Sequence, residues 1–146
     1  MRHHQPIGSF ASAAILAVAL GACSQPSGDV SEQPAGPQQR GTASYYGPGF
    51  QGRPTASGER FDRNAPTAAH RSLPLGSVAR VTNLETGQSE TVTINDRGPY
   101  ARGRIIDVSE GTAQRIGMKE DGTAPVEVTP LAVPGQQAAQ STPRGR

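Results

Sequence analysis

The sequence predicts a small, mainly β domain that closes into a barrel and carries one short helix. Gly (18) and Pro (13) are abundant among the 146 residues, and both interrupt helices, which argues against a helical bundle or a coiled coil. Apolar residues make up 34% and aromatic residues 4% of the chain, so any core is small. Short segments with strand-like alternation recur between turn residues, and closure into a barrel removes their exposed edges.

Five short segments are predicted strands, and they are taken here in chain order. They are Thr42–Tyr46, Ser77–Asn83, Glu90–Asn95, Arg104–Val108 and Pro125–Thr129. Residues 84–87 form a plausible hairpin turn between the second and the third. A short helix is predicted over 109–116, with Ser109 as its N-cap and Gly117 just past its end. Residues 67–71 are predicted to form a helical turn.

Two stretches with almost no bulky apolar residues flank the part of the chain that can fold. Residues 24–40 contain a single valine, and 133–146 have the same polar, Gly- and Pro-containing character, so neither can bury a core. The expected organisation is a signal peptide at 1–22, a flexible tether at 23–40, a folded domain at 41–131 and a disordered tail at 132–146.

The N-terminal residues have the features of an export signal. Arg2 precedes a small, apolar run over Phe10–Leu20, which is too short to span a bilayer, a task that needs roughly 20 residues, but suits a signal-peptide core. Leu20-Gly21-Ala22-Cys23 resembles a bacterial lipobox, in which the cysteine becomes the acylated first residue. The alternative is an ordinary signal with an unmodified cysteine. Because Cys23 is the sole cysteine and stands at the cleavage position, we expect a lipid anchor.

The residue after the cysteine and the charge balance predict where the protein resides and what it does not bind. Ser24 in place of Asp resembles the sorting signal for the outer membrane, so we expect a lipid-anchored protein of the cell envelope that faces the periplasm. Residues 41–131 contain ten Arg or Lys and ten Asp or Glu, so they lack the basic excess of a nucleic-acid binder. One cysteine and three histidines leave no multi-Cys or His-rich metal site, and we expect no metal or cofactor.

Three ionisable residues stand in loop-like motifs where a rigid barrel could present them for chemistry. Glu59 ends TASGE, His70 ends TAAH, and Asp96 lies in INDRGPY. Glycosidic cleavage needs a carboxyl group that protonates the leaving oxygen, and often a second carboxylate. Each residue also has a structural explanation: Asp96 could cap a turn, Glu59 could be a solvated charge, and His70 could bond a backbone carbonyl. Asp107, inside a predicted strand, is interpreted as a structural partner for an arginine or a backbone group.

A series of motifs in fixed order resembles the rare lipoprotein A (RlpA) family. The matching blocks are ASYYG, GRPTASGE, TAAHRSLPLG, NDRGPY and GRIIDVS, and the resemblance covers residues 41–128. Members are double-psi β-barrel lipoproteins, and some are lytic transglycosylases. The resemblance implies a six-stranded double-psi β-barrel with one or two short helices. It also implies that Asp96, Glu59 and His70 are catalytic and that substrate-binding residues line the cleft at Tyr45, Thr55 and Ser57.

The resemblance further implies a substrate and a reaction. Peptidoglycan glycan strands are cut between N-acetylmuramic acid and N-acetylglucosamine without water. A carboxylic acid protonates the glycosidic oxygen and then takes a proton from the C6 hydroxyl, which closes a 1,6-anhydro ring; Asp96 would carry that proton. Glu59 would stabilise positive charge on the sugar, and His70 would orient a carboxylate or the substrate.

Three other functions stay open at the level of sequence. They are a non-catalytic, expansin-like glycan-binding or wall-loosening module, an interaction lipoprotein with the barrel as scaffold, and an inverting hydrolase. Many family members carry a C-terminal SPOR domain that recognises peptide-free glycan and directs the protein to the septum. Because the sequence stops 15 residues after Leu131, we expect no such domain here and no septal targeting by that route.

Overall fold

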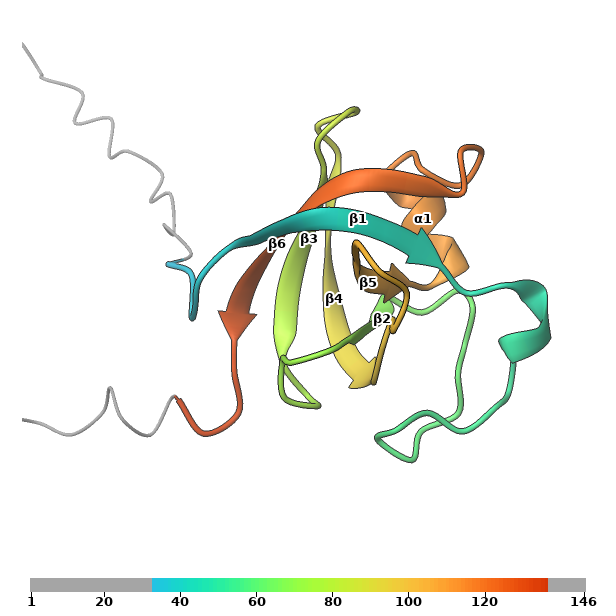
Figure 1. Cartoon of the computed structure of the whole chain (residues 1–146). Helices are drawn as coiled ribbons and strands as arrows, with labels where there is room; N and C mark the ends of the chain where they lie inside the picture. The colour runs from blue at the N-terminus through green and yellow to red at the C-terminus, as the bar shows by residue number, and fades with distance from the viewer. Residues whose placement is uncertain (1–32, 137–146) are drawn as a thin grey trace, which may run out of the picture. The chain divides into compact units, whose positions relative to one another are not determined.

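A computed structural model describes residues 33–136, and its strands curve around a common interior (Figure 1). In chain order the elements are β1 (Gln39–Tyr45), a 3-10 turn η1 (Pro48–Phe50), β2 (Thr67–His70), β3 (Val78–Asn83), β4 (Ser89–Asp96), β5 (Arg104–Val108), α1 (Glu110–Arg115) and β6 (Thr123–Ala132). The long segment between β1 and β2 projects from one side of the barrel (Figure 1). This segment and the ends of the strands form the site described below.

The strands close into a mixed six-stranded barrel in the order β1-β5-β2-β4-β3-β6. Two of the pairs, β1 with β5 and β2 with β4, are parallel, and the other four pairs are antiparallel. Closure leaves no unpaired strand edge, which removes the tendency of short strands to pair with other chains. The predicted mainly β, six-stranded barrel with one short helix is confirmed.

The interior of the barrel is filled by alternate residues of every strand. Ala43, Val81, Ile94, Ile106 and Val126 are each fully buried. Small and β-branched side chains of this kind fit a narrow barrel and the pleated surface of a strand. The polar residues between them on the same strands face outward. The alternation of apolar and polar residues in the sequence therefore corresponds to the inner and outer faces of the barrel.

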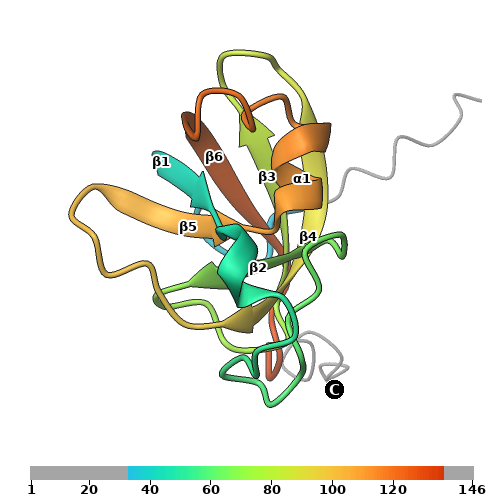
Figure 2. The same ribbon diagram turned by 90° about the vertical axis from the view of Figure 1, so that its right-hand side faces the viewer.

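The helix α1 packs beside β4 (Figure 2) and starts and ends as the sequence predicts. The Ser109 side chain accepts a hydrogen bond from the Thr112 N–H, which is the expected N-cap. Gly117 follows the helix with φ of 75°, a conformation that glycine adopts without steric cost. Gly111 lets the helix approach the 62–64 loop, because a Cβ at this position would lie 2.9 Å from the Asn64 carbonyl oxygen.

The prediction of a helical turn at residues 67–71 is wrong. This segment is β2 and pairs with β4 on one side and with β5 on the other. Its alanines favour a helix in isolation, but Ala68 is fully buried in the barrel interior, and both neighbouring strands supply backbone partners. Tertiary pairing therefore overrides the local preference.

The folded domain extends a few residues beyond its predicted boundaries at both ends. β1 begins at Gln39, inside the predicted tether, because residues 39–44 pair with 123–128 of β6. Ala35 donates its N–H to the Pro130 carbonyl over 2.7 Å, and Val133, inside the predicted tail, is 7% exposed. Backbone pairing orders these residues although they offer little apolar bulk. The predicted signal peptide and Cys23 lie outside the described residues. Within residues 33–136, no helix has the length and hydropathy needed to cross a membrane.

Candidate active site

The register of the strands brings Asp96 to the outer face of the barrel. Ile94 faces the interior, and alternation alone would turn Asp96 inward as well. The pairing of β2 with β4 skips one residue, so that Ala68 is opposite Ile94 but Ala69 is opposite Asp96. This β-bulge re-aims the end of β4, and Asp96 emerges beside Ala69 on the outside.

Three hydrogen-bond donors from three segments hold the Asp96 carboxylate. Its Oδ1 accepts from the backbone N–H groups of Ala56 and Arg97, both at 2.9 Å. Its Oδ2 accepts from the Tyr46 hydroxyl at 2.8 Å. Asp96 is only partly buried, so the carboxylate is oriented by the protein and still open to a ligand.

Tyr46 is the residue of this site that the sequence analysis missed. Its ring contacts Phe61 with centroids 4.5 Å apart and Phe50 with centroids 5.2 Å apart. Burial, and then the hydrogen bond to Asp96, raise the pKa of Tyr46 well above its usual range. The hydroxyl therefore stays protonated and acts as a donor to Asp96 at any physiological pH.

The expected substrate-binding residue Tyr45 lies apart from Asp96. It packs against the hydrophobic core, and its hydroxyl donates to the Lys119 carbonyl over 3.2 Å. Successive residues of a strand point to opposite faces, so Tyr46 reaches the carboxylate while Tyr45 cannot. The ASYYG motif contains both tyrosines, and the alternation inside it was the signal, but the sequence alone does not say which of the two faces outward.

The loop over residues 54–60 brings three further predicted site residues next to the end of β4. Its N-terminal half is tied back to Glu59: the Thr55 N–H donates to the Glu59 carbonyl over 2.7 Å, and the Thr55 and Ser57 hydroxyls are 3.0 Å apart. The Ser57 N–H donates to the Asn95 carbonyl over 3.0 Å, which fixes the loop to β4. The Glu59 side chain is exposed, and the Asn95 amide is 3.5 Å from its Oε2.

His70 lies beneath this face and not on it. It is paired with Ile106, an interior residue, and is 1% exposed. Its Nδ1 accepts from the N–H groups of Ser72 at 3.2 Å and Leu73 at 3.1 Å, so the remaining proton of the neutral ring is on Nε2. Burial, and then the charges of Arg97 and Arg71, lower the pKa of His70.

His70 and Asp96 are connected through Arg97 and not by a contact between their side chains. The Arg97 guanidinium donates from Nη1 to the carbonyls of His70 at 3.0 Å and Leu73 at 2.6 Å, and the Arg97 N–H binds Asp96. The structure therefore brings Asp96, Glu59, Thr55 and Ser57 together. The His70 imidazole supports the 70–73 turn under them, and it does so by accepting from backbone N–H groups, not by binding the backbone carbonyl that the structural explanation named.

Asp107 occupies the neighbouring position on the same outer row. It is opposite Ala69 on one side and Ser44 on the other, so Ala69 stands between Asp107 and Asp96. Its Oδ2 accepts from Arg104 Nη2 at 2.8 Å, which confirms the interpretation of Asp107 as the partner of an arginine. Burial raises the pKa of Asp107, and the Arg104 charge opposes that effect.

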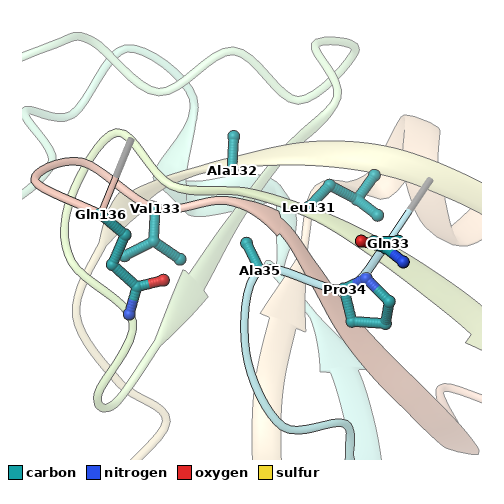
Figure 3. Close-up of a pocket in the computed structure, with 7 residues that line it drawn as sticks. All are labelled: Gln33, Pro34, Ala35, Leu131, Ala132, Val133 and Gln136. Carbon is teal, nitrogen blue, oxygen red and sulfur yellow. The ribbon is translucent and has the colours of Figure 1, made fainter. Parts of the chain in front are cut away.

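A separate hollow lies between the segment before β1 and the end of β6 (Figure 3). It is lined by Gln33, Pro34, Ala35, Leu131, Ala132, Val133 and Gln136. None of these side chains ionises near neutral pH, so this hollow cannot perform acid–base chemistry. Within residues 33–136 the fold assembles no group of three metal-ligating side chains. Within the described residues, the oriented Asp96 carboxylate and its surroundings are the candidate site for acid–base chemistry.

Comparison with known proteins identifies the family. A family model described as "Lytic transglycolase" matches residues 38–128, more than half of the chain. A probable endolytic peptidoglycan transglycosylase RlpA from Synechocystis sp. is 59% identical over 86 residues, which are 59% of this chain and 27% of that protein. The endolytic peptidoglycan transglycosylase RlpA of Neisseria meningitidis is 53% identical over 100 residues, 68% of this chain and 41% of that protein.

The chain belongs to the lytic transglycolase family of RlpA-type barrels, as the resemblance of its motifs implied. It spans less than half the length of these curated relatives. Solved structures share the fold at low identity. The Streptomyces papain inhibitor aligns with a TM-score of 0.55 and 19% identity over 66% of this chain and 96% of the inhibitor. An expansin from Clavibacter michiganensis aligns with a TM-score of 0.52 and 21% identity over 68% of this chain and 52% of the expansin. These likenesses support the double-psi type of barrel.

Proposed function

We propose that this protein is a lytic transglycosylase that cleaves peptidoglycan glycan strands between N-acetylmuramic acid and N-acetylglucosamine and leaves 1,6-anhydro ends. The observation that carries the proposal is the Asp96 carboxylate, which three donors orient at the edge of an exposed loop. The curated relatives that match over half of this chain bear the name endolytic peptidoglycan transglycosylase. The family model matches residues 38–128, and this range includes Asp96.

In the proposed reaction, one carboxyl group serves twice. Protonated Asp96 gives its proton to the glycosidic oxygen, and the bond from that oxygen to C1 of the muramic acid breaks with its electron pair on the oxygen. The resulting carboxylate then takes the proton of the C6 hydroxyl, and O6 bonds to C1. The proton is thereby returned to Asp96, and no water is consumed. General acid–base catalysis of this kind contributes about 10²–10⁴-fold to a rate.

Glu59 and His70 take different parts in the proposal. Glu59 is an exposed carboxylate in the loop that also supplies the Ala56 N–H to Asp96, so it is suited to face the positive charge that develops on the sugar ring. His70 holds the 70–73 turn through Nδ1, and this turn holds Arg97. We therefore infer that His70 orients Asp96 at a distance, through Arg97, and does not exchange a proton with the substrate. Thr55 and Ser57 offer hydroxyl groups to the glycan.

A second candidate function is a non-catalytic, expansin-like glycan-binding module, and one observation favours it. Tyr100 is 82% exposed and Phe50 is 43% exposed, and both follow segments that contact Asp96. Aromatic rings suit the apolar faces of sugars, and stacking needs no proton donor. A module of this kind would bind glycan without releasing products.

We further propose that the protein is anchored in the cell envelope by lipid at Cys23 and faces the periplasm from the outer membrane. The proposal rests on the lipobox-like sequence and on Ser24. More than one acyl chain is required for stable membrane attachment. Metabolic labelling with a fatty acid should mark the wild-type chain and not the Cys23→Ala variant, and label on the variant would refute the anchor.

The function is tested by mass spectrometry of the soluble products released from purified glycan strands, with and without stem peptides. We expect 1,6-anhydro-muramic ends from the wild type. Glu59→Gln should reduce their rate, and Asp96→Asn should abolish it. Loss of turnover in Glu59→Gln with retention in Asp96→Asn would exchange the two roles. Glycan that is retained by the protein but not cut, from either substrate, would support the binding module.

A further inference from the structure

We propose that Tyr46 is a positioning residue that makes Oδ2 of Asp96 the oxygen that carries the proton. The inference rests on the proposed transglycosylase function and adds a residue to it. Tyr46 directly follows β1, 50 positions before Asp96 in the chain, and no property of its side chain in the sequence distinguishes it from Tyr45.

The two oxygens of Asp96 have different surroundings. Oδ1 faces the N–H groups of Ala56 and Arg97, both at 2.9 Å. A backbone N–H donates and cannot accept, so a proton on Oδ1 would have to displace one of these hydrogen bonds. Oδ2 faces only the Tyr46 hydroxyl at 2.8 Å among the hydrogen bonds of the described structure. An oxygen that accepts one hydrogen bond keeps a second lone pair. This lone pair can bind the proton that the acid later gives to the substrate.

The orientation of the Tyr46 hydroxyl is restricted because two aromatic rings, Phe61 and Phe50, pack against the ring of Tyr46. Such aromatic contacts hold the ring without competing for its hydrogen bond. The hydroxyl then donates to one lone pair of Oδ2 and directs the other toward the open side of the site. Tyr46 in this way sets the direction from which a glycosidic oxygen must approach.

The charged groups around the pair leave Tyr46 in its donor role. Arg97 is held by the carbonyls of His70 and Leu73, Glu59 is next to Asn95, and Asp107 is paired with Arg104. Asp96 and Asp107 both raise the pKa of Tyr46 by their negative charges. The tyrosine therefore keeps its proton throughout the cycle, and the proton that moves is the one on Oδ2.

A hydrogen bond from Tyr46 stabilises the ionised carboxylate more than the protonated acid, because bonds to charged acceptors are the stronger ones. Loss of the hydroxyl should therefore weaken the stabilisation of the carboxylate relative to the acid. The step in which the carboxylate forms should also slow, since the new charge has lost a donor. Neither effect requires a change in the affinity for glycan.

The matched experiment compares Tyr46→Phe with Tyr45→Phe in the full chain. The two tyrosines are neighbours in the sequence, and each variant loses one hydroxyl. The hydroxyl of Tyr46 binds Asp96, whereas that of Tyr45 binds the Lys119 carbonyl. The readouts are kcat and KM for release of anhydro-muramic products from glycan strands across pH, with thermal unfolding of each variant as a check on the fold.

We expect Tyr46→Phe to lower kcat by about 10- to 100-fold, to leave KM within error, and to move the alkaline limb of the profile to higher pH. Tyr45→Phe should leave the position of the alkaline limb unchanged, because the hydroxyl of Tyr45 binds the Lys119 carbonyl and not Asp96. A Tyr46→Phe profile that coincides with that of Tyr45→Phe would overturn the inference, and so would a change confined to KM. If Tyr46→Phe does not fold, incorporation of 3-fluorotyrosine at position 46 gives a stronger donor of nearly the same shape, and the limb should move to lower pH; no movement would refute the role.

A failure of the proposed function is distinguishable from a failure of this inference. If the wild type releases no anhydro products, the function is wrong, and the role of Tyr46 is then read from the ¹³C NMR spectrum of the Asp96 carboxyl. Removal of the donor to Oδ2 should change the ¹³C chemical shift of that carboxyl in Tyr46→Phe at neutral pH and leave it unmoved in Tyr45→Phe. Equal chemical shifts in all three proteins would refute the inference without reference to activity.

Discussion

The inside and the outside of the same strands differ in what they contribute to this protein. The interior is largely apolar: Ala43, Ile94 and Ile106 are fully buried in one core cluster. The outer face beside them consists of donors and acceptors, with Asp96 and Asp107 on either side of Ala69. Neighbouring residues thus have unrelated roles, since Tyr45 packs on the core while Tyr46 holds the carboxylate. Stability should therefore be lost by changes on one side of a strand, and chemistry by changes on the other.

The largest effect on stability should come from an interior change that has a matched outward control. Ile106→Ala removes a fully buried side chain and should lower the free energy of unfolding by about 2–5 kcal/mol. Ile105→Ala removes the same atoms from the adjacent residue, which is only partly buried, and should cost clearly less. Urea unfolding of the two variants measures the difference. Equal losses would mean that side chains on the two faces of β5 contribute equally to the free energy of unfolding.

His70 should affect stability in a pH-dependent way, which tests whether it belongs to the interior. Its pKa is lowered in the folded state, above all by burial, while its value in the unfolded chain is about 6.5. Between the two values the unfolded state binds more protons, so stability is full above the unfolded pKa and falls as the pH drops below it.

The measurement is the free energy of unfolding of the wild type and of His70→Gln at a series of pH values. The wild-type curve should decline on acidification below about pH 6.5, and the difference between the two proteins should shrink there. The outcome that would contradict this is a difference in the free energy of unfolding that stays constant with pH, together with a changed pH profile of activity in His70→Gln. It would indicate that His70 acts on the reactive face and not in the interior.

The smallest effect should come from an ion pair far from both the core and Asp96. Arg40 Nε is 2.8 Å from Glu127 Oε2, and the Arg40 side chain is 73% exposed. Exposed pairs of this kind contribute about 0–1 kcal/mol, so Arg40→Ala should hardly change unfolding and should leave product release unchanged. Thermal melts at low and high salt give the measurement. A loss comparable to that of Ile106→Ala would show that the β1–β6 pairing depends on this surface charge.

The interior was easier to predict from sequence than the outer face, for reasons that particular residues make clear. Val78 to Asn83 and Ser89 to Asp96 alternate as strands should, and Ser109 and Gly117 mark the two ends of α1. The strand β2 escaped prediction because two alanines carry no signal that outweighs helix propensity. Its position is set by β4 and β5, which lie far from it in the sequence.

Much of the site could not have been found by residue type. Asp96 was recognised from its motif, but two of its three donors are backbone N–H groups, of Ala56 and Arg97. A backbone donor leaves no mark in a sequence. The third donor, Tyr46, could not be told from Tyr45 without the register. The β-bulge opposite Ala68 and Ala69, which turns Asp96 outward, likewise follows from three-dimensional pairing and not from local sequence.

The central claim is that chemistry resides on the outer face, at Asp96, and is separate from the barrel that supports it. The direct test is mass spectrometry of glycan-strand products from the wild type and from Asp96→Asn, with thermal unfolding of both proteins. We expect 1,6-anhydro ends from the wild type, a rate at least about 100-fold lower in the variant, and closely similar melting. Reducing ends in place of anhydro ends, or full turnover by a folded Asp96→Asn, would contradict the account.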